Sequence, residues 1–452
     1  MRRQLAPYVL AIVVLVCRDV HAQTSLQVDA IGAELNALAG ELIGKVSDRS
    51  ARLDFEQLRL KVVSAYKVSP IHKASTDRSA VAGARVQESR ARFLPQMSVS
   101  AYRGRDLVDT TTSNPDNSTQ TVTLTQFIYD FGSTLRDHDA FELERQSAEL
   151  QHYVDGSELM LRLVSAYFEV YRSAKQMEIS KSFITSREQF LDLIKQREAI
   201  GGSSRADIVR AEAKLAEAFD DLPSAIQRST SSGHRYSELF QSAPPRADIH
   251  ERPAFDIDGI KKDLRAVGRD TPAVKRAQLD VKVAEDRLEA ERMRRYGQVD
   301  LQASYSQGNA QTELNSRETS ARLQYSVNVF SGFSQESRIS QSALRLSEAQ
   351  EKLLSIENEQ ERILKDALLK VGTLDDLVDS RVGLVRRAKS ASDITRELFI
   401  LNRGSIADIF KAQEDYIAAT RNLLDAVVDR TIAFYELLHA VNALPRVMGE
   451  SY

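Results

Sequence analysis

The chain has 452 residues, of which 28% are charged and 42% are hydrophobic, and its formal net charge is −3. This balance excludes the strongly basic surface that is typical of nucleic-acid-binding proteins. Beyond the N-terminal segment no stretch is long and apolar enough for a transmembrane helix, which excludes a helical integral membrane protein.

The first 22 residues are predicted to be a signal peptide. Arg2 and Arg3 precede the apolar run LAPYVLAIVVLV, and Ala22 is a small residue at a suitable cleavage position. The apolar run is too short to span a bilayer, which disfavours a membrane anchor. Because the single cysteine, Cys17, lies in this segment, we expect an exported mature chain whose stability depends on no disulfide.

Residues 23–52 are predicted to form an amphipathic helical extension. The apolar residues of this segment recur at helical spacing, at Ile31, Leu35, Leu38, Leu42 and Val46. The spacing predicts one apolar face, but it does not identify the surface on which that face packs.

The rest of the chain carries an internal repeat. Three pairs of segments align without gaps at offsets of 201 or 202 residues: 53–70 with 255–272, 127–133 with 328–334, and 201–210 with 402–411. Single matches this short carry little information, but three in one register indicate a duplication. We therefore predict a first structural repeat over 53–250, a second over 251–446 and a short C-terminal tail over 447–452.

Each predicted repeat contains the same elements in the same order. A short helix ends at Pro70 or Pro272, and a helix of about two dozen residues follows. Next come two strands, whose apolar and polar residues alternate, and then two long helices joined by a turn. Each strand is about ten residues long, which suits a tilted strand that crosses a bilayer. The strands are expected near 96–106, 119–129, 298–308 and 319–330.

The longest predicted helices cover 133–199 and 334–400. Neither contains a proline, and at about 1.5 Å per residue each would be roughly 100 Å long. Apolar residues recur in both at spacings of three and four, which is typical of helices that pack lengthwise. A further helix is expected from 204 in the first repeat and over 405–444 in the second. Pro223, with the serine-rich segment after it, is expected to break the first of these.

Four strands per chain are too few to enclose a pore. About eight strands form the smallest closed barrel, and an open sheet in a membrane would leave backbone groups unpaired. Several chains must therefore share one barrel if these strands lie in a bilayer. Two chains would supply eight strands and a filled interior, whereas three would supply twelve and leave room for a channel.

The pattern Gly/Asn-x-x-Ser-x-x-Asp occurs at both turns between the long helices. Each serine stands where a helix begins, and an aspartate follows three residues later. This spacing predicts a capping box, in which the serine hydroxyl and the aspartate carboxylate each accept a hydrogen bond from the other residue's backbone. Glycine or asparagine suits the left-handed end of the preceding helix. The residues concerned are Gly201, Ser204, Asp207, Asn402, Ser405 and Asp408.

The signal peptide, the duplication, the two strand pairs and the two very long helices together resemble the TolC family of outer-membrane export channels. The resemblance covers residues 53 to 446 and is most specific at the paired turns and at the strand exits near Asp130 and Ser331. The second repeat departs from the family pattern at Gly297, where proline is usual, and at Asn402, where glycine is usual.

The resemblance implies a mainly α fold with a small β part. Long helices would form a coiled-coil tunnel in the periplasm, and four strands per chain would contribute to a shared trimeric β-barrel in the lipid of a Gram-negative outer membrane. The implied partners are a periplasmic adaptor (membrane fusion protein) and an inner-membrane ABC or proton-driven transporter. Such a homotrimer would serve type I protein secretion or small-molecule efflux, with the loops 106–118 and 308–317 facing outside.

The resemblance also implies a role for the two turns. They would lie at the tip of the tunnel, where the family docks its adaptors and closes the pore. All six turn residues would then contribute to docking, and Asp408 and Asp207 would lie at the constriction. The alternative, that both turns are only stable helix hairpins, explains the serines and aspartates by capping alone.

The sequence contains no motif for catalysis, for a metal or for a cofactor, so we expect no enzymatic activity. The HExxH motif, the Gly-rich phosphate loop and the nucleophile elbow are all missing. Two other functions stay open. A passive trimeric outer-membrane porin would not need helices of tunnel length, and a periplasmic coiled-coil scaffold would not need strands with an apolar face.

Overall fold

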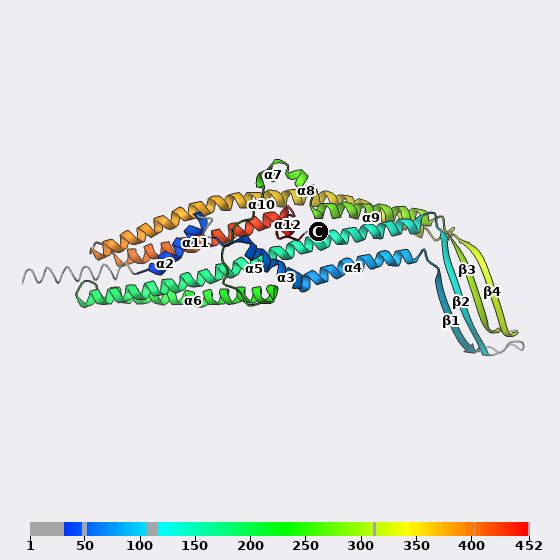
Figure 1. The fold of residues 1–452 in the computed structure, drawn as a ribbon, viewed down its shortest axis with the longest axis horizontal. Helices are drawn as coiled ribbons and strands as arrows, with labels where there is room; N and C mark the ends of the chain where they lie inside the picture. Colours follow the sequence, from blue (N-terminus) through cyan, green and yellow to red (C-terminus); the bar gives the residue numbers. More distant parts are fainter. Residues whose placement is uncertain (1–30, 48–51, 106–115, 311–312, 402, 451–452) are drawn as a thin grey trace, which may run out of the picture. The chain divides into compact units, whose positions relative to one another are not determined.

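The computed structural model describes residues 31–47, 52–105, 116–310, 313–401 and 403–450. The predicted signal peptide lies outside these ranges. Within them the chain is mainly helical and contains one four-stranded sheet (Figure 1), which confirms the predicted fold class. No helix of the described part combines enough length with enough apolar character to cross a membrane.

The elements of the two halves follow one another in a similar order. After an N-terminal helix, α2 (Ala33–Ser47), the first half consists of α3 (Phe55–Val68), α4 (Pro70–Ala91), β1 (Gln96–Arg105), β2 (Asp116–Tyr129), α5 (Ser133–Ala199) and α6 (Arg205–Phe240). The second half consists of α7 (Ile257–Lys262), α8 (Leu264–Arg269), α9 (Pro272–Arg294), β3 (Gln298–Ala310), β4 (Glu313–Ser326), α10 (Ser334–Ile400), α11 (Ile406–Ala440) and α12 (Leu444–Val447).

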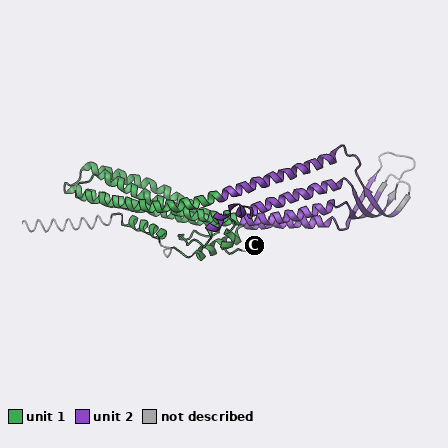
Figure 2. Ribbon diagram, turned by 90° about the horizontal axis from the view of Figure 1, so that it is seen from above, with its two compact units in different colours: residues 1–69, 157–257, 365–451 green, residues 70–156, 258–364, 452 purple. Residues whose placement is uncertain are grey.

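Two compact units divide the chain (Figure 2). We call residues 1–69, 157–257 and 365–451 the helical unit, and residues 70–156 and 258–364 the sheet unit. Both units take segments from both halves of the chain, and α5 and α10 each contribute to both. The units therefore do not coincide with the two predicted sequence repeats, whose division stays a prediction.

The sheet is antiparallel throughout, in the order β1-β2-β3-β4. Its central pair joins the two halves of the chain, because β2 pairs with β3. Strand β4 ends at Ser326, four residues before its expected end at residue 330. Ser326 pairs with Gln298, the first residue of β3, so the ladder between the two strands ends there. Alternate apolar side chains of the edge strands, such as Val99 and Leu323, are exposed in the single chain.

The exit from β2 into α5 is a tight reversal. Phe131 and Gly132 both have positive φ, at 62° and 97°. The buried Asp130 carboxylate accepts hydrogen bonds from the N–H of Gly132 (3.2 Å) and from the N–H of Thr134 (2.7 Å). A carboxylate that accepts the first free N–H groups of a helix stabilises its N-terminus, so this aspartate fixes where α5 begins.

Helix α6 corrects one prediction. We expected Pro223 to break the helix, but α6 continues unbroken from Arg205 to Phe240 with this proline inside it. A proline in a helix interior costs roughly 3 kcal/mol, so other interactions must offset it. Ala218 and Ala225, which flank it, are buried, and Ser232 Oγ lies 2.5 Å from Ser173 Oγ of α5. Packing against the neighbouring helix therefore overrides the local signal.

The core of the helical unit lies between α5 and α11. Both helices bury long apolar stripes, and α2 and α3 add side chains to the same cluster. Leu35, Ala39 and Leu42 of α2 belong to it, each at most 4% exposed. The apolar face predicted for the N-terminal extension thus packs on the helical unit.

Candidate helix-tip site

The first turn, between α5 and α6, closes with a left-handed glycine. The N–H of Gly202 donates to the carbonyl of Arg197 (2.7 Å), and the N–H of Gly201 donates to that of Glu198 (2.9 Å). These two bonds form a Schellman motif, which pairs carbonyls that a helix end leaves free. Gly201 has a φ of 78°, a conformation that costs other residues roughly 1–2 kcal/mol. The backbone itself therefore explains this glycine.

The beginning of α6 carries the predicted capping box. Ser204 Oγ accepts from the N–H of Asp207 (3.2 Å), and the Asp207 carboxylate accepts from the N–H of Ser204 (3.1 Å). The same carboxylate also accepts from the Ser204 hydroxyl (2.8 Å). Two free N–H groups of the helix start are thus satisfied reciprocally. Both of these donors to the Asp207 carboxylate, the N–H and the hydroxyl, belong to Ser204, in the same turn.

The second turn, between α10 and α11, closes in a related way. The N–H of Arg403 donates to the carbonyl of Leu398 (2.8 Å), which is the longer bond of a Schellman motif. Asn402, the residue predicted to occupy the left-handed position, lies outside the described residues. The prediction for Asn402 therefore stays a prediction.

The beginning of α11 departs from the predicted capping box. Ser405 Oγ accepts from the N–H of Ala407 (3.2 Å), one residue earlier than the box requires. The Asp408 carboxylate makes no return bond to the Ser405 N–H, and the Asp408 side chain is exposed. The capping-box prediction is thus wrong at this turn. The Asp408 carboxylate is thus exposed and takes no part in capping α11.

Arg197 links the two turns, and the sequence analysis missed it. The Arg197 guanidinium donates to the carbonyl of Phe399 on α10 (2.9 Å) and to that of Gly202 (3.4 Å). It also lies 4.4 Å from the centre of the Phe399 ring. Burial in this position lowers the pKa of Arg197. The sequence signal was a basic residue in the last turn of α5, which by itself indicates only a favourable charge at a helix C-terminus.

An apolar cluster supports both turns from within. Aromatic and aliphatic side chains of α5, α10 and α11 pack together there, and the cluster includes Phe190, Ile194, Phe399, Ile406, Ile409 and Phe410. The Phe190 ring meets the Phe399 ring at 5.8 Å and the Phe410 ring at 5.3 Å between centres. Such a cluster transmits a displacement of one turn to the other, because close-packed interiors are not freely deformable.

Arg187 is a second residue that no sequence pattern singles out. Its side chain is about 1% exposed and lies 4.6 Å from the ring centres of both Phe183 and Phe410. It donates to Gln413 Oε1 (2.9 Å) and lies 3.5 Å from a carboxylate oxygen of Glu414. Burial lowers the pKa of Arg187 to about 10, which still leaves it charged at neutral pH. It joins α5 to α11 beneath the tips.

A polar groove lies between the helices of the helical unit. Its volume is about 1440 Å³, and α5, α6, α10 and α11 all contribute to its lining. Charges of both signs line it, including Arg172, Arg228 and Asp425, and Arg172 forms an ion pair with Asp429. Burial raises the pKa of Asp425. Among the residues that the structure describes, no group of three or more His, Cys, Asp or Glu side chains is placed to hold a metal ion.

Comparisons with known proteins agree on one family. The sequence profile described as "Outer membrane efflux protein" matches residues 71–232. Outer membrane protein TolC of Vibrio cholerae is 22% identical over 378 residues, which is 79% of this chain and 84% of that protein. Outer membrane efflux protein BepC of Brucella suis is 22% identical over 424 residues, which is 91% of this chain and 90% of that protein.

The fold agrees with a solved channel. The crystal structure of the Campylobacter jejuni CmeC outer membrane channel superposes with a TM-score of 0.75 at 13% identity and covers 86% of each chain. Two sequence relatives over most of their length, a matching family profile and this shared fold point to the same conclusion. These comparisons all indicate the TolC-like family of outer membrane efflux proteins.

Proposed function

We propose that three copies of this chain form one continuous duct of a tripartite export system. The observation that carries the proposal is the four-stranded sheet, in which β1 and β4 are edge strands, each paired on one side only among the described residues. Unpaired strand edges are prohibitive in hydrocarbon, and four strands cannot close on themselves. Strand β4 of one copy pairing with β1 of the next keeps every neighbour antiparallel and closes a barrel of twelve strands.

The proposed route continues through the helices. The helical unit supplies the periplasmic tunnel, and the two turns form its tip. In the trimer these tips dock a periplasmic adaptor, which connects the duct to an inner-membrane ABC or proton-driven transporter. Two features support this role: the exposed residues at both turns and the exposed carboxylate of Asp408. An exposed charge at an interface contributes to partner choice and to the association rate.

The oligomer is tested by extracting the protein from outer membranes in mild detergent. The purified species should have the mass of three mature chains and should conduct ions in planar bilayers. A monomeric species that conducts would contradict the shared barrel, because four strands cannot enclose a pore.

The docking role is tested with a photocrosslinking amino acid at two exposed arginine positions. Arg205 stands beside the first turn, and Arg338 lies on the part of α10 in the sheet unit. The proposal predicts an adduct with the adaptor from position 205 and none from position 338. Adducts of equal yield from both positions would show that the tips are not a specific docking surface.

The export role is tested by deleting the gene. Loss of a secreted protein with unchanged drug sensitivity would indicate type I secretion, and drug sensitivity with unchanged secretion would indicate efflux. If both are unchanged while the purified trimer conducts, the protein is a passive porin and the tripartite proposal is wrong.

A further inference from the structure

Helix α2 and Ile31 just before it precede both halves of the chain and together contact three of the four helices that lead to the tips. We propose that Ile31 and α2 together act as a clamp, which holds α5 against α10 and α11 and keeps the two tips in their resting arrangement. This inference rests on the proposed function, because it assumes that the tips belong to a duct that opens and closes.

The clamp is seated by apolar side chains in two clusters. Leu35, Ala39 and Leu42 belong to the main core of the helical unit. Ile31, just before α2, belongs instead to the cluster under the turns, which also contains Phe399. All four side chains are at most 4% exposed. Because burial of apolar surface is the main stabilising term in packing, α2 stays docked without a partner protein.

Polar contacts tie the clamp to one helix after another. On α5, the Lys175 ammonium lies 3.0 Å from a Glu41 carboxylate oxygen. On α11, the Tyr416 hydroxyl donates to Asn36 Oδ1 (3.0 Å). On α10, the Arg396 guanidinium donates to the carbonyl of Ile31 (2.8 Å). Ile31 and α2 together thus contact three long helices.

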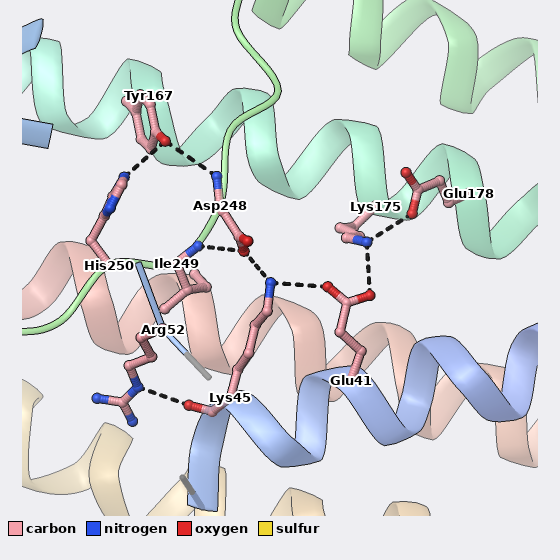
Figure 3. Close-up of polar contacts among 9 residues, drawn as sticks. All are labelled: Glu41, Lys45, Arg52, Tyr167, Lys175, Glu178, Asp248, Ile249 and His250. Atoms are coloured by element: carbon pink, nitrogen blue, oxygen red, sulfur yellow. Dashed lines mark hydrogen bonds and ion pairs between the residues drawn. The ribbon is translucent and has the colours of Figure 1, made fainter. Parts of the chain in front are cut away.

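The other end of α2 is anchored on the segment between α6 and α7. Figure 3 shows the Lys45 ammonium between the carboxylates of Asp248 and Glu41, and it forms ion pairs with both. Lys45 is only 6% exposed, so its charge depends on these partners. The N–H of Asp248 in turn donates to the Tyr167 hydroxyl of α5 (3.2 Å). Removal of the clamp therefore requires unpairing a buried charge as well as exposing apolar surface.

The charges of the anchor reinforce one another. Burial opposes ionisation of Glu41, but Lys45 and Lys175 outweigh this effect and hold the pKa of Glu41 below its usual value. Burial likewise opposes the charge of Lys175, and Glu178 and Glu41 raise its pKa nonetheless. Glu41 and Lys175 therefore remain charged near neutral pH, and their ion pair holds α2 on α5 there.

Two features separate a clamp from an ordinary core helix. First, α2 lies outside both hairpins, α5–α6 and α10–α11, so its release breaks no turn between long helices. Second, the bond to α10 joins Ile31 to Arg396 near the C-terminal end of that helix, close in sequence to the second turn. Release of α2 would therefore free the α10 end next to the tip and leave the core between α5 and α11 in place.

An engineered disulfide can lock the proposed clamp. An ideal Cβ on Gly32 would lie 3.6 Å from Ser186 Oγ of α5, so cysteines at both positions would bring their thiols close together. The only natural cysteine is Cys17, inside the predicted signal peptide. The variant Gly32→Cys/Ser186→Cys can thus be compared oxidised and reduced in one preparation. This comparison cancels the backbone strain at Gly32, whose φ is 80°.

A second variant weakens the clamp without a core cavity. Arg396→Gln with Tyr416→Phe removes the polar contacts to α10 and α11 and leaves the apolar side chains of α2 in place. The matched control is Glu158→Gln with Arg162→Gln, which removes an exposed ion pair within α5 that does not involve α2.

The readout is single-channel recording of each purified trimer in planar bilayers. We expect the oxidised disulfide variant to stay closed and its reduced form to behave as the wild type. The Arg396→Gln/Tyr416→Phe variant should open on the order of tenfold more often, and the control should match the wild type. Equal open probability in the oxidised and reduced forms, with the disulfide verified by mass spectrometry, would overturn the clamp.

Hydrogen exchange keeps this test separate from the test of the duct. In the Arg396→Gln/Tyr416→Phe variant, the backbone amides of 403–410 should exchange faster than in the control. Oxidation of the disulfide variant should slow the exchange of the same amides. If no trimer conducts under any condition, the duct proposal fails, and exchange alone decides the clamp. Unchanged exchange in the Arg396→Gln/Tyr416→Phe variant would show that α2 is only part of the core and not a clamp.

Discussion

The turns that follow α5 and α10 share one sequence pattern, but the structure uses its aspartate in two ways. At the first turn Asp207 closes a capping box with Ser204. At the second turn Ser405 bonds to the N–H of Ala407, and the Asp408 carboxylate is exposed and makes no bond to Ser405. A duplicated motif thus does not guarantee a duplicated role. The carboxylate that caps its own helix is unavailable to a ligand, and the other is free to act.

The same contrast extends to the residues around the turns. Arg197 of the first turn reaches across to Phe399 of α10, whereas its neighbour in the second turn, Arg403, is exposed. The first turn is therefore the more constrained of the two, and the second is the better candidate for a constriction. Four experiments test this difference between the two turns.

The largest effect is expected from the two aspartates. In a trimer, three Asp408 carboxylates around one passage attract multivalent cations strongly, each by about 1 kcal/mol or more at close range in water. Asp408→Asn should therefore weaken block by a trivalent cation from the periplasmic side by roughly a hundredfold. Asp207→Asn should weaken it far less. Single-channel recording measures both, and equal block of the wild type and Asp408→Asn would leave Asp408 without a role at the constriction.

The next effect concerns the arginines. Arg197→Met removes a charged hydrogen bond and a cation–π contact, and it should lower the free energy of unfolding by about 2 kcal/mol. Arg403→Met, the matched change at an exposed position, should lower it by less than about 0.5 kcal/mol. Chemical unfolding in detergent compares the two. Similar losses for both would show that the first turn is no more constrained than the second.

The left-handed position of the first turn gives a third test. Gly201→Val should cost about 1–2 kcal/mol of stability, and export should fall sharply if adaptors bind the tips. Gly201→Asn introduces the residue found at position 402 and should preserve both, since asparagine tolerates this conformation. The double variant Gly201→Val/Asn402→Val extends the test to the second turn. Normal export by a correctly localised double variant would mean that both turns are only structural.

The smallest effect separates the two caps. Loss of a serine cap costs about 0.5–2 kcal/mol. Ser204→Ala also removes the hydrogen bond from the Ser204 hydroxyl to the Asp207 carboxylate, so it should cost about 0.5 kcal/mol more than Ser405→Ala. Thermal unfolding of matched preparations resolves this difference, and Ser204→Thr should restore most of the stability. A larger loss from Ser405→Ala would reverse our ranking of the two caps.

The class of fold and the position of the turns could be predicted from local sequence patterns alone. The proline-free stretches define α5 and α10, because helix propensity and apolar spacing are local properties that the chain carries everywhere. The alternation of apolar and polar residues in the strands and the Ser204 cap could be predicted as well, because both are local patterns. The apolar face of α2 could be predicted too, but the surface that it packs on could not. The spacing of apolar residues shows that one face of a helix is apolar and does not show which residues cover it.

Features that depend on contacts with residues distant in the chain could be seen only in the tertiary structure. Pro223 stays inside α6 because packing on α5 offsets a local cost. Arg197 and Arg187 gain their partners only when α10 and α11 lie beside α5. The sequence also did not show whether Asp408 takes part in a capping box. A serine cap can accept from the N–H two or three residues later, and only the folded turn shows that Ser405 accepts from Ala407.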